Sequence, residues 1–145
     1  MSTVKNILQQ KGNAVHSISP NSSVYDALEE LEEKNIGSLV VVENGKLTGV
    51  FTERDYARKV VLKGRSSKDT LVRDIMSSHP FFVNPDNTLE ECMQLMTDKF
   101  IRHIPVLEND ELVGVISIGD IVKYTISEKD FIIDHLEHYI TGRKS

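Results

Sequence analysis

The feature that most constrains the fold is a duplication inside the chain. Residues 14–61 align with residues 79–126 at a constant offset of 65 residues and without a gap. The identical pairs include Pro20/Pro85, Ile36/Ile101, Glu43/Glu108, Asn44/Asn109, Gly49/Gly114 and Asp55/Asp120. Agreement of turn, core and polar residues over this length indicates two copies of one structural unit. A few short strands with helices on one face bury too little alone, so we expect the two units to pack together.

Each unit has the pattern of a strand, a helix, two strands and a closing helix. In the first unit an extended segment over 14–18 precedes a Ser-Pro-Asn turn and an apolar stripe with helical spacing. Strands over 38–42 and 47–51 flank Glu-Asn-Gly-Lys, and Asn-Gly is the strongest short hairpin signal. A helix over 53–63, ended by Gly64, closes the unit. The second unit is expected to repeat the three strands and the closing helix at 81–83, 103–107, 112–116 and 118–126.

Two further helices are predicted outside the duplication. One covers residues 3–11 and ends at Gly12; the other covers residues 128–141. The second has an apolar stripe that should pack on the body or on a second chain; its members are Phe131, Ile132, Leu136, Tyr139 and Ile140. The sequence therefore predicts an α+β protein of two βαββα repeats packed as a pseudo-twofold pair, with extra N- and C-terminal helices. The expected domains are 1–64 (first repeat with the N-terminal helix), 65–127 (linker and second repeat) and 128–145 (C-terminal helix and tail).

The amino-acid composition limits the classes of partner and the cellular location that can be expected. A hydrophobic content of 39% and a charged content of 27% are typical of a soluble globular protein. The net charge of −5 disfavours a nucleic-acid surface. No apolar run approaches the ~18–20 residues that span a membrane, and residues 1–12 lack an apolar signal core. Because Cys92 is the single cysteine, no internal disulfide forms, and a reducing, cytoplasmic location is expected.

The residues with chemical potential lie in a repeated signature: glycine, two apolar residues, a hydroxyl residue, two further residues and an aspartate. Its polar members are Thr52 and Asp55 in the first copy, and Ser117 and Asp120 in the second. Capping of the following helix explains the spacing, since a hydroxyl at the N-cap and an acid three residues later cap each other. Ligand binding is the alternative. An aspartate after a strand can accept both ribose hydroxyls, and a helix N-terminus favours phosphate. Because the same strand end, a glycine and two apolar residues, precedes the hydroxyl residue in both copies, the sequence favours ligand binding.

The signature, with Arg102-His103-Ile104-Pro105-Val106 as a basic pair before an apolar-Pro strand start, resembles the tandem CBS-domain pair. This regulatory module is named after cystathionine β-synthase. The resemblance covers roughly residues 3–126 and is greatest to small stand-alone bacterial CBS pairs. It implies an adenine nucleotide (AMP, ATP or NAD(H)) bound in clefts between the units, and a homodimer.

The resemblance and the chemistry together give a candidate nucleotide site. Asp55 and Asp120 would hold ribose, and Thr52 and Ser117 would lie near ribose or phosphate. Positive or polar groups facing phosphate would come from Arg54, Arg58, Arg102 and His103, with Lys123 as a further source of charge. The adenine slot would be walled by Val15, Ile18, Ile36, Ile104 and Pro105. Gly37 and Ser38 match Arg102 and His103 in the first unit. Because the copies differ, one well-formed site or two sites of different selectivity are expected.

The sequence thus favours a regulatory sensor of energy or redox state that changes the behaviour of a partner protein. The alternative is a dimerisation or protein-interaction module without a ligand. An enzyme is not expected, and His103 is interpreted as a ligand contact or a structural residue rather than a general base. No metal is expected, because one pair of histidines, His135 and His138, is not a site. Cys92 is interpreted as a small buried core residue.

Overall fold

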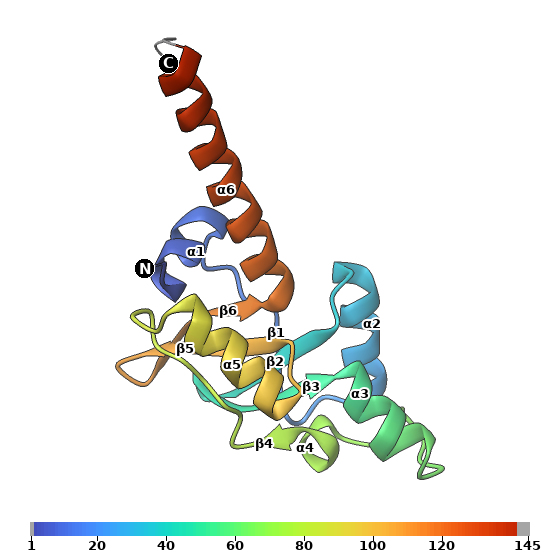
Figure 1. Ribbon diagram of the computed structural model, residues 1–145. Helices are drawn as coiled ribbons and strands as arrows, with labels where there is room; N and C mark the ends of the chain where they lie inside the picture. Colours follow the sequence, from blue (N-terminus) through green and yellow to red (C-terminus); the bar gives the residue numbers. More distant parts are fainter. Residues whose placement is uncertain (1, 142–145) are drawn as a thin grey trace.

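The computed structural model describes residues 2–141, and from residue 130 onward it describes the side chains of Ile133 and Leu136 alone. The elements (Figure 1) are α1 (Val4–Lys11), β1 (Ser17–Ile18), α2 (Val24–Lys34), β2 (Ser38–Glu43), β3 (Lys46–Thr52), α3 (Glu53–Tyr56), the π-helical η1 (Ala57–Val61), α4 (Val72–Ile75), β4 (Ser77–Ser78), α5 (Leu89–Lys99), β5 (His103–Glu108), β6 (Glu111–Ser117) and α6 (Ile118–Thr141). This order confirms the predicted α+β class with a duplicated βαββα pattern.

The two units form separate sheets that meet through β3 and β6. The first sheet has the order β1-β2-β3-β4, with β1 parallel to β2 and the other pairs antiparallel. The second is the β5-β6 hairpin. The predicted opening strands are shorter than expected. The one over 14–18 shrinks to two residues, and the one over 81–83 to a single parallel bridge from Val83 to Val106. In both segments the residues that fall outside a strand lie at the N-terminal end.

The hairpins follow the predicted turn chemistry. Asn44 and Gly45 have φ of 53° and 77°, and Asn109 and Asp110 have φ of 53° and 64°. Two consecutive positive φ angles match the right-handed twist of the strands, which is why Asn-Gly and Asn-Asp suit these positions. Both hairpins also carry an irregularity at the same place, after Val41 and after Val106.

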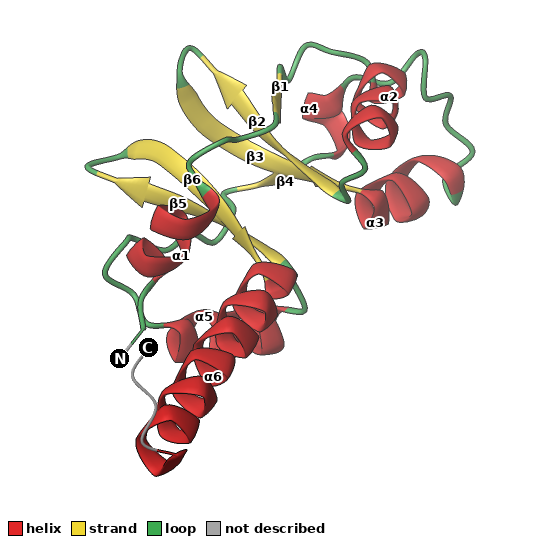
Figure 2. Ribbon diagram, turned by 90° about the horizontal axis from the view of Figure 1, so that it is seen from above, coloured by secondary structure: helices red, strands yellow, loops and turns green. Residues whose placement is uncertain are grey.

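The short helices that precede each unit are exchanged between the units. Val4, Ile7 and Leu8 of α1 are buried in the core of the second unit, with Ile104, Val106 and Ile116 among its members. Val72 and Ile75 of α4, which lies in the linker, are buried in the core of the first unit. Figure 2 shows α1 beside β5 and β6, and α4 beside α2. Each unit therefore completes its core with a helix that precedes the other unit in the chain.

Matching backbone hydrogen bonds fix the exchanged helices. The Val4 and Lys5 amides of α1 donate to Asn87 O and Pro85 O of the second unit, both at 2.9 Å. In the same way, the Val72 amide donates to Ser22 O at 2.9 Å and the Arg73 amide to Pro20 O at 3.0 Å. The acceptors are equivalent positions of the two repeats, so the exchange follows the duplication.

The end of the chain differs from the prediction. The helices expected over 118–126 and 128–141 are one continuous helix, α6, which extends away from the body (Figure 1). No glycine or proline interrupts residues 120–141, so nothing in the sequence breaks the helix between the two expected segments. Of the predicted apolar stripe, Leu136 is 55% exposed. The other four members, Phe131, Ile132, Tyr139 and Ile140, lie outside the described side chains.

Within residues 2–141, none of the helices is both long enough and apolar enough to cross a membrane.

Candidate functional site

The repeated signature lies at the end of β3 in the first unit and at the end of β6 in the second. In both copies the predicted cap forms. Thr52 Oγ1 accepts a hydrogen bond from the Asp55 amide at 3.1 Å, and Ser117 Oγ accepts one from the Asp120 amide at 3.0 Å. Each aspartate in turn accepts from the backbone amide of its hydroxyl residue. Capping therefore explains one hydrogen bond to each carboxylate. The two copies differ in the other contacts that the carboxylates make.

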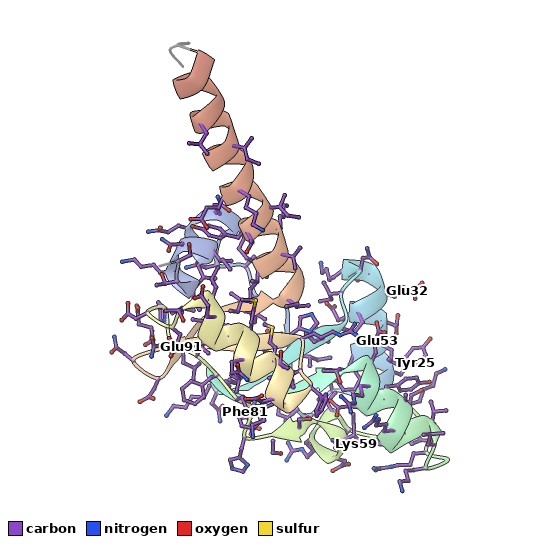
Figure 3. The ribbon with its side chains drawn as sticks, viewed as in Figure 1. Tyr25, Glu32, Glu53, Lys59, Phe81 and Glu91 are labelled. Carbon is purple, nitrogen blue, oxygen red and sulfur yellow. The ribbon has the colours of Figure 1, made fainter. Side chains whose placement is uncertain are left out.

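Asp55 belongs to a closed polar cluster. Its side chain is 9% exposed, and both of its carboxylate oxygens have partners. Oδ2 accepts from the Thr52 amide and hydroxyl, each at 3.1 Å. Oδ1 lies 3.1 Å from Lys59 Nζ and 3.3 Å from Ser77 Oγ of β4. Figure 3 labels Lys59 in the segment that follows α3. A ribose at Asp55 would have to replace these contacts.

Asp120 is more open. Its side chain is 24% exposed, and the recorded hydrogen bonds all go to Oδ2, from the Ser117 amide at 2.9 Å and from Lys11 Nζ at 2.7 Å. Burial alone would raise the pKa of Asp120, but the hydrogen bonds from Lys11 and Ser117 outweigh it and lower the pKa below its ordinary value. The carboxylate is therefore charged at neutral pH and has one oxygen, Oδ1, without a recorded partner among the described residues.

His103 lies at the boundary between the units, near enough to Asp120 to be influenced by its charge. It is paired with Ser117 across the β5-β6 hairpin, and its Cε1 lies 4.0 Å from the position that a Cβ on Gly37 would occupy. Burial lowers the pKa of His103, and the positive charges of Lys11 and Arg102 lower it further, while Asp120 opposes the shift. The imidazole is therefore mainly neutral at pH 7, with one ring nitrogen able to donate a hydrogen bond and the other able to accept one. Gly37, with no side chain, leaves room for it.

The predicted arginines lie on the surface. Arg54 reaches across to the second unit, where its Nη1 donates to the Phe100 carbonyl at 3.2 Å. Arg58 and Arg102 are exposed. Arg102 is adjacent to His103, and its carbonyl accepts the Ile118 amide at 2.9 Å, which ties it to the first turn of α6. Positive charge is thus available at the second site from Arg102 and Lys11.

The apolar residues predicted to wall the adenine are not gathered in one pocket. Ile18 lines a hollow of about 420 Å³ whose other members are mostly acidic: Asp26, Glu29, Glu30 and Glu33, with Ser17 and Ser22. Four carboxylates would repel a phosphate. Ile36 lines a second hollow of about 530 Å³ between α2 and α3, with Glu32 and Glu53 at its rim (Figure 3).

The remaining wall candidates offer mainly backbone. Ile104 is fully buried in the second core and Pro105 is buried beside it, so a ligand would meet their main chain rather than their side chains. Val15 is half-buried before β1, and Ser38 is half-buried opposite Thr52. The structure thus brings together Asp120, Ser117 and His103 with Gly37, whereas the hollows lined by Ile18 and by Ile36 include none of these four residues.

Three residues that contact the aspartates are not among the predicted site residues: Lys11, Lys59 and Ser77. Lys59 lies one helical turn after Asp55, and this spacing could have predicted the ion pair. Lys11 is 109 residues from Asp120 and Ser77 is 22 residues from Asp55. Both come from the exchanged segments, so they become neighbours of the aspartates only when α1 packs on the second unit and β4 pairs with β3.

Two further expectations concern reactive groups. Cys92 is buried in the second core, as predicted, and burial raises the pKa of its thiol to about 11, so it stays protonated at neutral pH. Among the described residues, no group of three or more histidine, cysteine or acidic side chains is arranged to hold a metal ion. The His135 and His138 side chains lie outside that description. The cytoplasmic location stays a prediction.

Comparison with known families agrees with the duplicated fold. The family described as "CBS domain" matches residues 4–62 and 72–127, once for each unit. The chain therefore belongs to the CBS domain family. A curated relative, the mitochondrial CBS domain-containing protein CBSX3 of Arabidopsis thaliana, is 39% identical over 149 residues, which cover 97% of this chain and 72% of the relative.

Solved structures extend the comparison. A protein with CBS domains from Burkholderia ambifaria has a TM-score of 0.84 and 47% identity, covering 87% of this chain and 95% of its own. CBSX2 in complex with AMP has a TM-score of 0.75 and 27% identity, covering 89% and 99%. A hexameric CBS-CP12 protein from bloom-forming cyanobacteria has a TM-score of 0.74 and 29% identity, covering 84% and 70%. These similarities confirm the CBS-pair fold.

Proposed function

We propose that the chain is a non-enzymatic regulatory module that binds an adenine nucleotide such as AMP, ATP or NAD(H). The nucleotide would bind at Asp120, and its level would report energy or redox state to a partner protein. The supporting observation is the contrast between the two aspartates. Asp120 is charged, half-buried and has a carboxylate oxygen without a partner among the described residues, whereas Asp55 is enclosed by Thr52, Lys59 and Ser77. The AMP complex of the related CBSX2 supports the ligand class.

The neighbours of Asp120 suit a nucleotide. Ribose hydroxyls would donate to the carboxylate, as they do to the acidic residue of dinucleotide folds. The neutral His103 imidazole would offer a hydrogen bond, and Arg102 lies beside it to attract phosphate. Because His103 also faces Gly37 of the first unit, a ligand held there would contact both units. Binding would then favour one packing of the two units over another, provided the affinities for the two packings differ.

Thermal unfolding with and without nucleotide tests the proposal. Wild-type protein and Asp120→Asn are heated with millimolar AMP, ADP, ATP, NAD, NADH or S-adenosylmethionine. A ligand at 100 times its dissociation constant adds about 2.7 kcal/mol to the free energy of unfolding. We expect a selective rise of the midpoint that the Asp120→Asn variant lacks. No rise with any of these compounds would contradict nucleotide sensing.

A second role, self-association, is proposed from α6. Five apolar side chains fall within about 80° of the helix circumference. They are Ile118, Val122, Ile126, Ile133 and Leu136, with exposed fractions from 37% to 55%. Another side of α6 contacts the body of the protein: Ile121 is buried in the second core, and Glu128 accepts a hydrogen bond from Ser2. The hexameric state of the related CBS-CP12 protein supports a second copy of this chain as the occupant.

Light scattering of the purified protein tests the self-association. A stripe of exposed isoleucine and valine costs free energy in water, so we expect a homodimer. The double variant Ile126→Lys, Ile133→Lys should be a monomer, whereas the control Ser127→Lys, at an exposed position outside the stripe on the same helix, should dimerise as wild type does. A wild-type monomer at high micromolar concentration would contradict the proposal.

A further inference from the structure

The second site contains a cation that the family signature does not include. Lys11, the last residue of α1, places its Nζ 2.7 Å from Asp120 Oδ2 and 2.9 Å from the Val115 carbonyl of β6. Its side chain is 35% exposed. The ammonium thus lies at the end of β6, beside the carboxylate that the proposed function assigns to ribose.

Asp55 of the first unit also has a lysine, but of a different kind. Lys59 lies one turn further along the same helical segment, and it is also bonded to the Ile75 carbonyl at 3.0 Å. The side chain of Lys59 is itself 44% exposed, but the carboxylate that it pairs with is 9% exposed and has both oxygens bonded, so a ribose would meet an occupied acceptor there. Lys11 comes from a separate helix and is followed by Gly12 with φ of 87°, at the start of the exposed segment 12–14. Its four-carbon stem can turn without disturbing the buried side of α1.

Ribose binding at Asp120 would bring Lys11 into competition with the sugar. A ribose has two donor hydroxyls: one can bind Oδ1, and the other would then donate to Oδ2, to which the Lys11 ammonium is already bonded at 2.7 Å. A nucleoside would displace the ammonium and leave it without an anion. A nucleotide would displace it too, but would supply a phosphate as a new partner within the reach of the lysine stem. The neutral state of His103 leaves Lys11 and Arg102 as the cations of this site.

We infer that Lys11 determines the specificity of the Asp120 site: it opposes binding of unphosphorylated nucleosides and favours nucleoside phosphates. The inference rests on the proposed function, because it takes Asp120 as the ribose contact. It adds a residue from outside the repeat that holds the site, and it makes α1 sensitive to the ligand. When the ammonium moves from Asp120 to phosphate, the link between the end of α1 and the end of β6 changes.

Calorimetric titration with AMP and with adenosine tests the inference. The proteins are wild type, Lys11→Met, Lys11→Arg and the matched control Lys5→Met, an exposed lysine on the same helix. In Lys11→Met we expect adenosine to bind more tightly and AMP more weakly. The ratio of the adenosine Kd to the AMP Kd should fall about tenfold or more, as for the loss of one charge-assisted hydrogen bond. Lys11→Arg and Lys5→Met should keep the wild-type ratio.

The outcomes separate the two proposals. If AMP binds the wild type and the ratio is the same in Lys11→Met as in Lys5→Met, Lys11 has no role in specificity, although the nucleotide site stands. If neither compound binds the wild type, the proposed function fails and the role of Lys11 fails with it. Urea unfolding of each variant verifies that the titrated protein is folded.

Discussion

The two repeats share one pattern but differ in what surrounds their aspartates. In the first unit, β4 and Lys59 enclose Asp55, so its carboxylate stabilises the fold. In the second unit no strand equivalent to β4 pairs with β6 among the described residues, and α1 supplies a single lysine to Asp120. The comparison teaches that one duplicated signature can be enclosed in one copy and open in the other. The segments exchanged between the units decide which copy is which.

Substitutions in the exchanged helices should have the largest effect on stability and test whether the two units have separate cores. Ile7 of α1 is 2% exposed and Ile75 of α4 is 1% exposed, so they are matched residues of the two cores. Replacement of either by alanine should lower the free energy of unfolding by about 3–4 kcal/mol through loss of burial and a cavity. Hydrogen exchange should locate the effects differently. Ile7→Ala should speed exchange in β5 and β6, and Ile75→Ala in β2 and β3. Equal acceleration in both units would contradict separate cores.

The signature glycines give a second, smaller contrast. A methyl group on Gly49 would lie 2.7 Å from Met76 Sδ and 2.9 Å from the Ser77 carbonyl oxygen of β4. At Gly114 the closest atom would be Leu8 Cδ2, at 2.8 Å. A leucine side chain can turn away, but a paired strand cannot. We expect Gly49→Ala to cost about 3 kcal/mol and Gly114→Ala about 1 kcal/mol in urea unfolding. The reverse order would show that the environment of β3 is the more adaptable one.

The aspartates themselves should differ in stability. Asp55→Asn weakens the contacts with the Thr52 amide and hydroxyl, Ser77 and Lys59, and should cost about 2 kcal/mol. Asp120→Asn weakens the cap of α6 and the exposed pair with Lys11, and should cost about 0.5–1 kcal/mol. Urea unfolding at pH 7 measures both. Equal losses would argue that Asp120 is as structural as Asp55.

The smallest expected effect is the pH dependence that His103 contributes. Its pKa in the folded protein is lowered from the ordinary value of 6.5 by burial, so the unfolded chain binds more protons between the two pKa values. Stability is therefore fully present above pH 6.5 and falls as the pH drops toward the folded pKa. His103→Gln should flatten this slope, by less than about 1 kcal/mol, and the exposed His16→Gln should keep it. An unchanged slope in His103→Gln would place the titration elsewhere.

Local features of the fold could be predicted from the sequence because local chemistry determines them. Asn44-Gly45 fixes a hairpin, and the apolar spacing fixes α2 and α5. The helix caps at Thr52 and Ser117 could be predicted for the same reason. The exchange of α1 and α4 could not be predicted, because both helices have similar apolar faces and the sequence does not indicate which core each helix enters.

The unequal sites were predicted only in outline. The different residues at 54, 58, 102 and 103 indicated that the copies diverge, but they did not show that Asp55 is enclosed. That enclosure depends on Ser77, which is 22 residues from Asp55, and the ion pair of Asp120 is with Lys11, which is 109 residues away. The continuous α6 also differs from the two helices expected over 118–126 and 128–141, because no glycine or proline separates them.

Titration of AMP by calorimetry into wild type, Asp55→Asn and Asp120→Asn tests most directly that the second copy is the binding copy. We expect wild type and folded Asp55→Asn to bind with Kd values within about threefold of each other, and Asp120→Asn to bind at least about tenfold more weakly, since it loses the charged acceptor. Wild-type affinity in Asp120→Asn, together with loss of binding in Asp55→Asn, would contradict the account and assign the ligand to the first unit.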